Sequence, residues 1–194
     1  MDADAELVDR LRAGDEAAFA TLVQRYHPPL LRLAQSTVGS RAVAEEAVQD
    51  TWLAVVRGVD RFEGRSSLKT WLFQILVNRA RSAGGRELRS GGFHDELDEA
   101  GSFDASGRWA EPPEVWADRV DDRIVARHLA DRVIDLLEQL PGAQRQVVLL
   151  RDVEGLPAKD VAALLGISDV HQRVLLHRGR ARLRALLEAE VGRQ

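Results

Sequence analysis

The side chains that could carry out a reaction are few and scattered. The chain has no cysteine, and its five histidines, His27, His94, His128, His171 and His177, do not recur at a spacing typical of metal ligands. It contains no glycine-rich phosphate loop with a lysine, and no G-x-S-x-G or H-E-x-x-H motif. We therefore expect no enzymatic activity, no metal or other cofactor and no small-molecule substrate.

Charge is the chemistry that the sequence does offer. Its 31 acidic residues outnumber 27 basic ones, but the two signs are unevenly distributed. Residues 64–89 contain six basic residues and one acidic residue, and residues 170–187 contain five arginines and no acidic residue. Between them, residues 90–123 contain ten acidic and three basic residues. Two basic segments separated by an acidic one favour a nucleic-acid partner despite the net charge of -4.

Apolar residues recur mostly at helical spacing along the segments that must position these charges. The alternating apolar and polar residues typical of β-strands are nearly missing. Asp15, Ser67 and Ser168 are placed to cap helix N-termini. We expect a bend at Pro28-Pro29 in the second helix. The predicted helices are Ala5–Arg12, Glu16–Val38, Ala42–Val56, Ser67–Arg81, Asp122–Gln139, Gly142–Arg151, Ala158–Leu165 and Asp169–Glu190.

The organisation follows from the segment that interrupts these helices. Residues 90–120 combine glycines and Pro112-Pro113 with acidic residues, a composition typical of a linker. We predict an all-α fold of two small helical domains, 1–89 and 122–194, joined by a long acidic linker, 90–121. The acidic N-terminus lacks the features of a signal peptide, and no apolar run reaches about 18 residues. A cytoplasmic location without membrane insertion is expected.

The predicted helix Ala42–Val56 has a second face besides its core face. This face carries Glu45, Gln49, Trp52 and Val56, flanked by Glu46, Asp50 and Leu53. Apolar side chains framed by charges are typical of a protein-binding surface. The alternative is that another helix of the same domain covers Trp52.

The predicted helix Ser67–Arg81 carries a polar stripe that includes a tryptophan. Trp71 lies with Gln74, Asn78 and Arg81 on the side away from the leucines. An aromatic ring beside amide and guanidinium groups suits stacking on unpaired bases, while the cations hold phosphates. The alternative places Trp71 in the core and the arginines on a solvated face.

The C-terminal helices have the spacing of a helix-turn-helix. A short helix is followed by the turn Leu165-Gly166-Ile167 and a second helix that begins after Ser168. Arginines on both flanks of the second helix suit phosphate contacts around a major groove. The alternative is an ordinary helical hairpin with an arginine-rich solvent face.

Three stretches in this order resemble bacterial alternative sigma factors of the extracytoplasmic-function (ECF) class. They are VAEEAVQDTWLAVV, RFEGRSSLKTWLFQILVNRAR and LEQLPGAQRQVVLLRDVEGLPAKDVAALLGIS, the last followed by LLHRGRARLR. The resemblance implies a non-enzymatic subunit that binds core RNA polymerase and promoter DNA. It also implies control by an anti-sigma factor, commonly membrane-linked. The main alternative is a stand-alone helix-turn-helix regulator.

The resemblance also implies a role for particular residues. The loop Glu63–Leu68 would hold a flipped base of the opened strand. Core polymerase would contact Glu45, Glu46, Gln49, Asp50, Trp52 and Leu53. Minus-ten DNA would contact Arg65, Ser66, Ser67, Lys69, Trp71, Asn78, Arg79 and Arg81. Minus-thirty-five DNA would contact Lys159, Ser168, His171, Gln172, Arg173, Arg178 and Arg180.

The acidic linker would thread toward the polymerase active-site cleft, with Trp109 and Trp116 as anchors; the alternative is a plain spacer.

Two departures from the family pattern bear on these expectations. A run from Val170 to Leu175 replaces the common Gly-Thr-Val-Lys-Ser-Arg-like run, so the minus-thirty-five preference is expected to be unusual or based on DNA shape. Ser82, in place of a common aspartate, is followed by Gly84-Gly85, which predicts an early end of the preceding helix.

Overall fold

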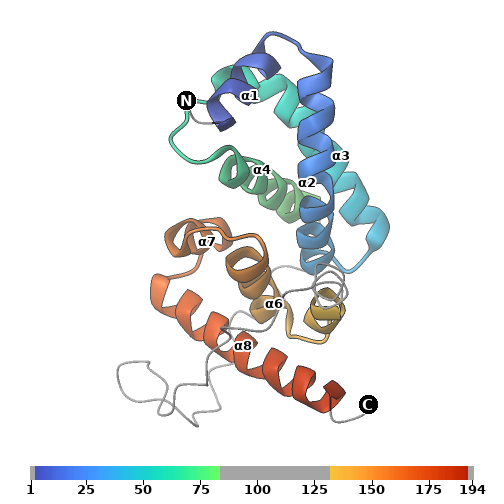
Figure 1. Cartoon of the computed structure of the whole chain (residues 1–194), viewed down its shortest axis with the longest axis vertical. Helices are drawn as coiled ribbons and strands as arrows, with labels where there is room; N and C mark the ends of the chain where they lie inside the picture. The colour runs from blue at the N-terminus through green and yellow to red at the C-terminus, as the bar shows by residue number, and fades with distance from the viewer. Residues whose placement is uncertain (1–2, 84–131, 192–194) are drawn as a thin grey trace.

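The computed structural model describes residues 3–83 and 132–191, which form two groups of helices (Figure 1). The N-terminal group contains α1 (Ala3–Arg12), α2 (Glu16–Thr37), α3 (Arg41–Gly58), the 3-10 turn η1 (Val59–Arg61) and α4 (Leu68–Ala83). The C-terminal group contains a helical segment over residues 132–137, then α6 (Gly142–Val148), η2 (Leu149–Val153), α7 (Ala158–Leu165) and α8 (Asp169–Val191). No strand occurs in either described range, and the predicted all-α fold is confirmed.

The predicted helix caps are confirmed by hydrogen bonds. The Asp15 carboxylate accepts from the backbone N–H groups of Ala17 and Ala18 at 2.9 and 3.1 Å. The bond from Ala18 is the main reason why the pKa of Asp15 is lowered. Ser67 Oγ accepts from the N–H of Thr70 at 3.0 Å, and Ser168 Oγ accepts from the N–H of His171 at 3.1 Å. Each cap satisfies N–H groups that have no carbonyl partner in a helix's first turn.

Two helices end differently from the sequence expectation. The helix α4 reaches Ala83, two residues beyond the predicted end at Arg81. The helix α2 is continuous through Pro28 and Pro29, as the predicted helix Glu16–Val38 is. The predicted helix Gly142–Arg151 instead ends at Val148 and widens into the π-type turn η2. There the N–H of Glu154 donates to the carbonyl oxygen of Leu149, five residues back, at 2.9 Å. This turn brings the Glu154 side chain into the interior, where the residue is 8% exposed.

Several expectations concern parts of the chain outside the described residues. These are the acidic linker 90–121 with its anchors Trp109 and Trp116, the glycines that follow Ala83, and the first ten residues of the predicted helix Asp122–Gln139. Within the described ranges, no helix is long and apolar enough to cross a membrane.

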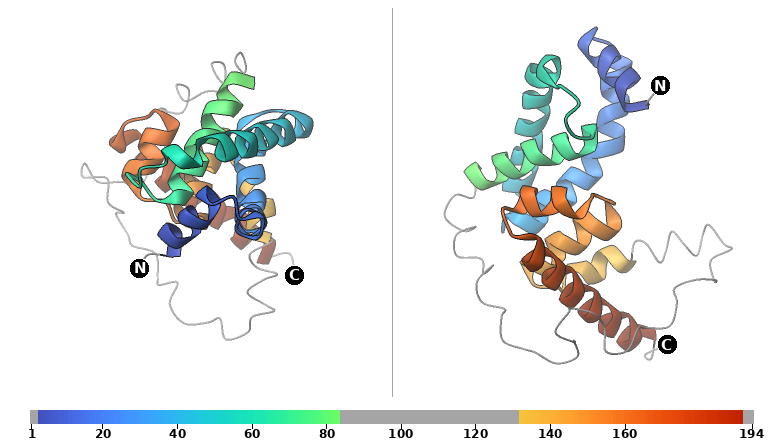
Figure 2. Two further views of the ribbon diagram at one scale, coloured as in Figure 1. Left: turned by 90° about the horizontal axis from the view of Figure 1, so that it is seen from above. Right: turned by 90° about the vertical axis from the view of Figure 1, so that its left-hand side faces the viewer.

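The two groups of helices pack against each other. Buried side chains of both groups, such as Leu33 and Leu76 of the first and Leu150 and Leu164 of the second, belong to one contiguous apolar cluster. In the two views of Figure 2, α7 lies beside α4, and α6 contacts the end of α2. The side-chain amide of Gln146 donates to the carbonyl oxygen of Ser36 at 3.0 Å across this boundary.

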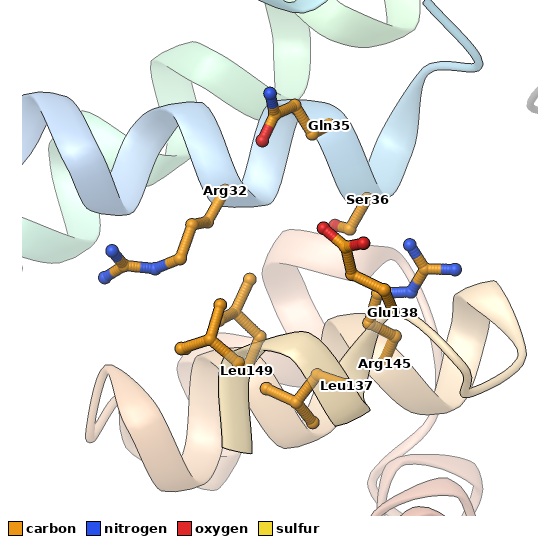
Figure 3. A pocket seen from close by; sticks show the side chains of 8 residues that line it. Arg32, Gln35, Ser36, Leu137, Glu138, Arg145 and Leu149 are labelled. Atoms are coloured by element: carbon orange, nitrogen blue, oxygen red, sulfur yellow. The ribbon is translucent and has the colours of Figure 1, made fainter. Parts of the chain in front are cut away.

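A shallow groove marks the same boundary (Figure 3). Arg32, Gln35 and Ser36 of α2 form one wall, and Glu138 and Arg145 lie on the facing wall. Because its walls come from both groups, the groove exists only while the two groups are packed together.

At Gly179, α8 packs closely against α6. A Cβ atom at this position would lie 2.5 Å from Val148 Cγ2 and 3.4 Å from Gln144 Cβ. We predict that Gly179→Ala lowers the free energy of unfolding of the C-terminal group by about 1–2 kcal/mol, because overpacking outweighs the roughly 1 kcal/mol that alanine adds to helix stability. Urea denaturation followed by circular dichroism measures the change.

Gly142, the first residue of α6, provides the matched control because a Cβ atom there would meet nothing within 4 Å. Gly142→Ala should leave the stability unchanged or raise it. Equal stabilisation by both alanines would contradict the close packing at Gly179.

Candidate binding surfaces

The outer face of α3 combines acidic and apolar side chains, all exposed to solvent. Leu53 and Val56 are 54% and 57% exposed, the most exposed of the large apolar side chains in the N-terminal group. Arg41 Nε donates to Glu45 at 2.8 Å, at the start of this face. The α3 surface, as we call it, consists of Glu45, Glu46, Gln49, Asp50, Leu53 and Val56.

Trp52, expected on the same face, is only half-buried by its neighbours. Its Nε1–H donates to His27 Nδ1 at 3.3 Å, and its ring meets Phe19 edge to face with centroids 6.0 Å apart. Both partners are on α2. The alternative in which another helix covers Trp52 is thus correct for much of its ring, and Leu53 is the more accessible side chain.

The residues predicted to contact minus-ten DNA fall into two sets. Arg65, Asn78 and Arg79 are exposed; Arg65 forms an ion pair with Glu63, and Asn78 Oδ1 accepts from Gln74 at 3.2 Å. Ser66 and Ser67 lie immediately before α4, and Ser67 is the N-cap of that helix. Trp71, half-buried, packs on Phe62 with ring centroids 5.1 Å apart.

The second set, Lys69 and Arg81, contacts the C-terminal group, although Arg81 remains exposed. Lys69 Nζ lies 2.9 Å from Glu154 Oε2, and Arg81 donates to the carbonyl oxygen of Leu164 at 2.9 Å. The structure therefore brings together two basic side chains of α4 and acceptors of α7 and its preceding turn, a contact that the sequence analysis did not foresee.

The helix-turn-helix is formed by α7, a turn at Gly166 and α8. Gly166 has φ +68°, a left-handed conformation that glycine adopts without steric cost, and ends α7. On the side that faces solvent, Lys159 and Arg173 are exposed, and His171 and Arg178 are half-buried. Two apolar side chains accompany them in the first turns of α8, Val170 at 64% and Val174 at 37% exposed.

Two residues predicted to contact the duplex differ from the others: Gln172 is buried, and Arg180 forms an ion pair within the C-terminal group while its side chain stays 53% exposed. Gln172 is 1% exposed, so its side chain lies in the interior and we leave it out of the duplex surface. Arg180 donates twice to Asp152, at 2.8 and 2.5 Å, and this hydrogen bonding raises the pKa of Arg180. Burial lowers the pKa of nearby His177.

Sequence analysis missed the residues at the contact between the two groups and the apolar pair on α8. Arg32, Glu154 and Asp160 gave no local signal, because their partners lie 85 to 122 residues away in the chain. Val170 and Val174 did give a sequence signal. They are apolar residues four positions apart, so they share a helix face, and Arg173 lies between them. Among the described side chains, none cluster in a way that could hold a metal ion.

Comparison with known proteins agrees with this arrangement. Residues 22–89 match Sigma-70 region 2, and residues 130–183 match Sigma-70, region 4. The RNA polymerase sigma factor CarQ of Myxococcus xanthus is 32% identical over 189 residues, which cover 96% of this chain and 100% of CarQ. The ECF RNA polymerase sigma-E factor of Escherichia coli strain K12 is 31% identical over 167 residues, covering 84% of this chain and 82% of that protein.

Two solved structures share the fold. CnrH in complex with the cytosolic domain of CnrY has a TM-score of 0.57 and 26% identity, covering 97% of this chain and 99% of that one. The sigma factor RpoE in complex with the anti-sigma factor NepR, from Bartonella quintana, has a TM-score of 0.55 and 26% identity, with 88% and 96% covered.

Sigma factors are not enzymes, which agrees with the lack of catalytic motifs in the sequence. The helices α2 to α4 correspond to region 2, and α6 to α8 correspond to region 4. The chain belongs to the ECF class of RNA polymerase sigma factors, which bind core polymerase and promoter DNA and direct promoter-specific transcription initiation through these two regions.

Proposed function

We propose that the α3 surface is where this chain docks on core RNA polymerase. The observation that carries the proposal is the exposure of Leu53 and Val56, more than half of each side chain, inside a frame of acidic residues. Protein interfaces concentrate their binding energy in such apolar centres, and the surrounding charges set orientation and association rate. Trp52 supports the surface from below through its contacts with α2.

Region 2 then contacts the minus-ten element along α4 and the loop before it. Arg65 and Arg79 are exposed cations suited to phosphates, and Asn78 can hydrogen-bond a base edge. The half-exposed ring of Trp71 offers a stacking platform for an unpaired base. Arg81 belongs to this surface as well, because it is exposed despite its bond to Leu164, whereas Lys69 is held by Glu154.

Region 4 binds the minus-thirty-five element as a duplex through the first turns of α8. Arg173 and Lys159 supply the accessible cations, and Ser168, His171 and Arg178 complete the surface. Val170 and Val174 add an apolar patch of the kind that contacts thymine methyl groups in a major groove. This patch gives the unusual run after Ser168 a physical role in promoter preference.

The domain bounds 1–89, 90–121 and 122–194 remain our proposal, supported by the extents of the two family matches.

We also assign this chain an anti-sigma partner and a cytoplasmic location. The neighbouring structures support the partner, because CnrH was solved with a cytosolic domain of CnrY, and RpoE with the anti-sigma factor NepR.

One experiment tests the proposed function. The purified chain is mixed with core bacterial RNA polymerase, the complex is isolated, and run-off transcription is measured from a library of candidate promoters. We expect a stable complex and promoter-dependent transcripts. Tight duplex binding by the chain alone, without polymerase binding, would instead identify a stand-alone regulator.

A further inference from the structure

The end of α1 holds the backbone at the start of the loop that precedes α4. Arg12, the last residue of α1, donates from Nη2 to the carbonyl oxygen of Phe62 at 2.5 Å. The two residues are 50 positions apart in the chain. Phe62 directly precedes the loop Glu63–Leu68, which we expect to hold a flipped base. Arg12 therefore fixes the place where this loop begins.

Both backbone polar groups of Phe62 have partners. Its N–H donates to the carbonyl oxygen of Val59 at 3.1 Å, which closes the turn η1, and its carbonyl oxygen accepts from Arg12. A hydrogen bond from a charged donor is roughly twice as strong as one between neutral groups. The backbone therefore leaves η1 in one fixed direction.

Asp9 and the packing of α1 hold the Arg12 side chain in place. Arg12 Nη1 donates to Asp9 Oδ1 at 3.3 Å, one helical turn earlier on the same side of α1. On the inner side of this helix, Val8 is buried, and Leu7 and Leu11 pack against the apolar core. Because the helix is anchored through its apolar side, Arg12 reaches the loop from a rigid support.

Phe62 also supports the Trp71 side chain. The two rings pack with centroids 5.1 Å apart at an angle of 50°. Gly58, at the end of α3, borders the same indole, since a Cβ atom at this position would lie 3.6 Å from Trp71 Cζ2. The orientation of the indole therefore depends on where Phe62 lies, and Arg12 holds the Phe62 backbone.

The far end of the loop is fixed by α4 itself. Ser67 Oγ accepts from the N–H of Thr70 at 3.0 Å, and the Ser67 carbonyl oxygen accepts from the N–H of Trp71 at 3.0 Å. Between the two ends, residues 63–65 are exposed. The loop is thus anchored on both sides of an accessible centre, by α4 at one end and by Arg12 at the other.

We propose that Arg12 is a positioning residue for opening of the minus-ten element. By holding the Phe62 carbonyl oxygen, it sets the base-holding loop and the stacking surface of Trp71 before DNA arrives. A site that is already ordered binds more tightly, because its ordering cost is not incurred during binding. The inference rests on the proposed role of α4 and its preceding loop. It gives a part in promoter opening to α1, which lies N-terminal to the residues matched by Sigma-70 region 2.

Three variants test this role. Arg12→Met removes the donors but keeps an unbranched apolar stem and a similar helix propensity, whereas Arg12→Lys keeps one charged donor. Arg10→Met is the matched control, because Arg10 lies on the same helix but donates to Asp15, before α2, at 2.8 Å. Since apolar packing anchors α1, all three variants should keep the helical circular dichroism spectrum of the parent chain.

Fluorine NMR of chains labelled with fluorotryptophan measures the positioning without polymerase or DNA. Arg12→Met should shift or broaden the resonance of Trp71, which Trp71→Phe identifies. The resonance of Trp52 should stay unchanged, because its contacts are with α2. Arg12→Lys should return the Trp71 resonance toward its position in the parent chain, and Arg10→Met should not move it. An unchanged Trp71 resonance in Arg12→Met would overturn the proposal.

Permanganate reactivity of thymines in the minus-ten element measures opening by the polymerase-bound chain, on a promoter taken from the run-off library. Arg12→Met should lower the equilibrium constant for opening about fivefold, because the lost hydrogen bond is charge-assisted but exposed. Arg12→Lys should recover most of this loss, and Arg10→Met should open the promoter as the parent chain does. Normal opening by Arg12→Met would reject the positioning role.

Salt dependence separates positioning from a direct phosphate contact by Arg12. The readout is binding of a fluorescent minus-ten single strand to polymerase carrying each variant, at several salt concentrations. Loss of a phosphate contact would reduce the slope of log K against log salt by about 0.7, whereas loss of positioning lowers K and leaves the slope unchanged. A reduced slope in Arg12→Met would assign Arg12 to DNA and overturn the proposal.

Core-polymerase binding, measured in parallel, separates the two levels of inference. All variants and the parent chain should bind polymerase equally, because Arg12 is not part of the α3 surface. If the parent chain does not bind polymerase, the proposed function fails, and the Trp71 resonance still decides whether Arg12 positions the indole.

Discussion

Leu53→Ser should weaken binding to core RNA polymerase by at least about 30-fold, the loss typical of a central apolar interface residue. Leu53 is 54% exposed and makes no contribution to the buried core, so the variant should unfold at the same denaturant concentration as the parent chain. Fluorescence anisotropy with labelled protein measures the affinity.

Val153→Ser is the control for this prediction. Val153 is also exposed, at 38%, but belongs to η2 in region 4. Its replacement removes a similar apolar side chain without adding charge, and polymerase binding should be unchanged. Equal losses in the two variants, or no loss in Leu53→Ser, would reject the α3 surface as the docking site.

The contrast between Leu53 and Trp52 shows how far helical spacing alone can predict a site. Spacing placed both residues on the outer side of one helix, and it could not say which one a neighbouring helix covers. That depends on how α2 crosses α3, which brings Phe19 and His27 against the indole. Trp52→Ala therefore tests packing and docking together, whereas Leu53→Ser tests docking alone.

Local features were the most predictable. Asp15, Ser67 and Ser168 each cap the helix expected of them, because a cap depends on residues two or three positions away. The turn at Gly166 and the bounds of α7 follow from equally local preferences. The all-helical class needed only the apolar periodicity.

Contacts between distant segments were not predictable in the same way. Lys69 and Arg81 were assigned to DNA from residue type and position, and the acceptors that hold them lie 83 to 85 residues further along the chain. The π-type turn that directs Glu154 inward replaced what periodicity predicted as a continuing helix. Gln172 likewise had the residue type of a base-contacting side chain, but its place on the inner side of α8 buries it.

Arg173→Ala should lower the affinity of the polymerase-bound chain for its minus-thirty-five duplex by about 5- to 150-fold. Arg173 is exposed in the first turns of α8, the part of a recognition helix that reaches a major groove, and its only described contact is a 3.3 Å bond to the carbonyl oxygen of Asp169. Competition binding with duplexes that vary one base pair at a time measures both affinity and preference.

Arg182→Ala is the matched control, because Arg182 is an exposed arginine on the same helix, nine residues further from its N-terminus. It should reduce affinity little and leave preference unchanged. If Arg173→Ala relaxes preference at one base pair, Arg173 reads a base edge; if it weakens all duplexes alike, it holds a phosphate and Val170 becomes the stronger candidate for base readout. An unchanged affinity would remove the first turns of α8 from the duplex surface, because Arg173 is the most accessible cation there.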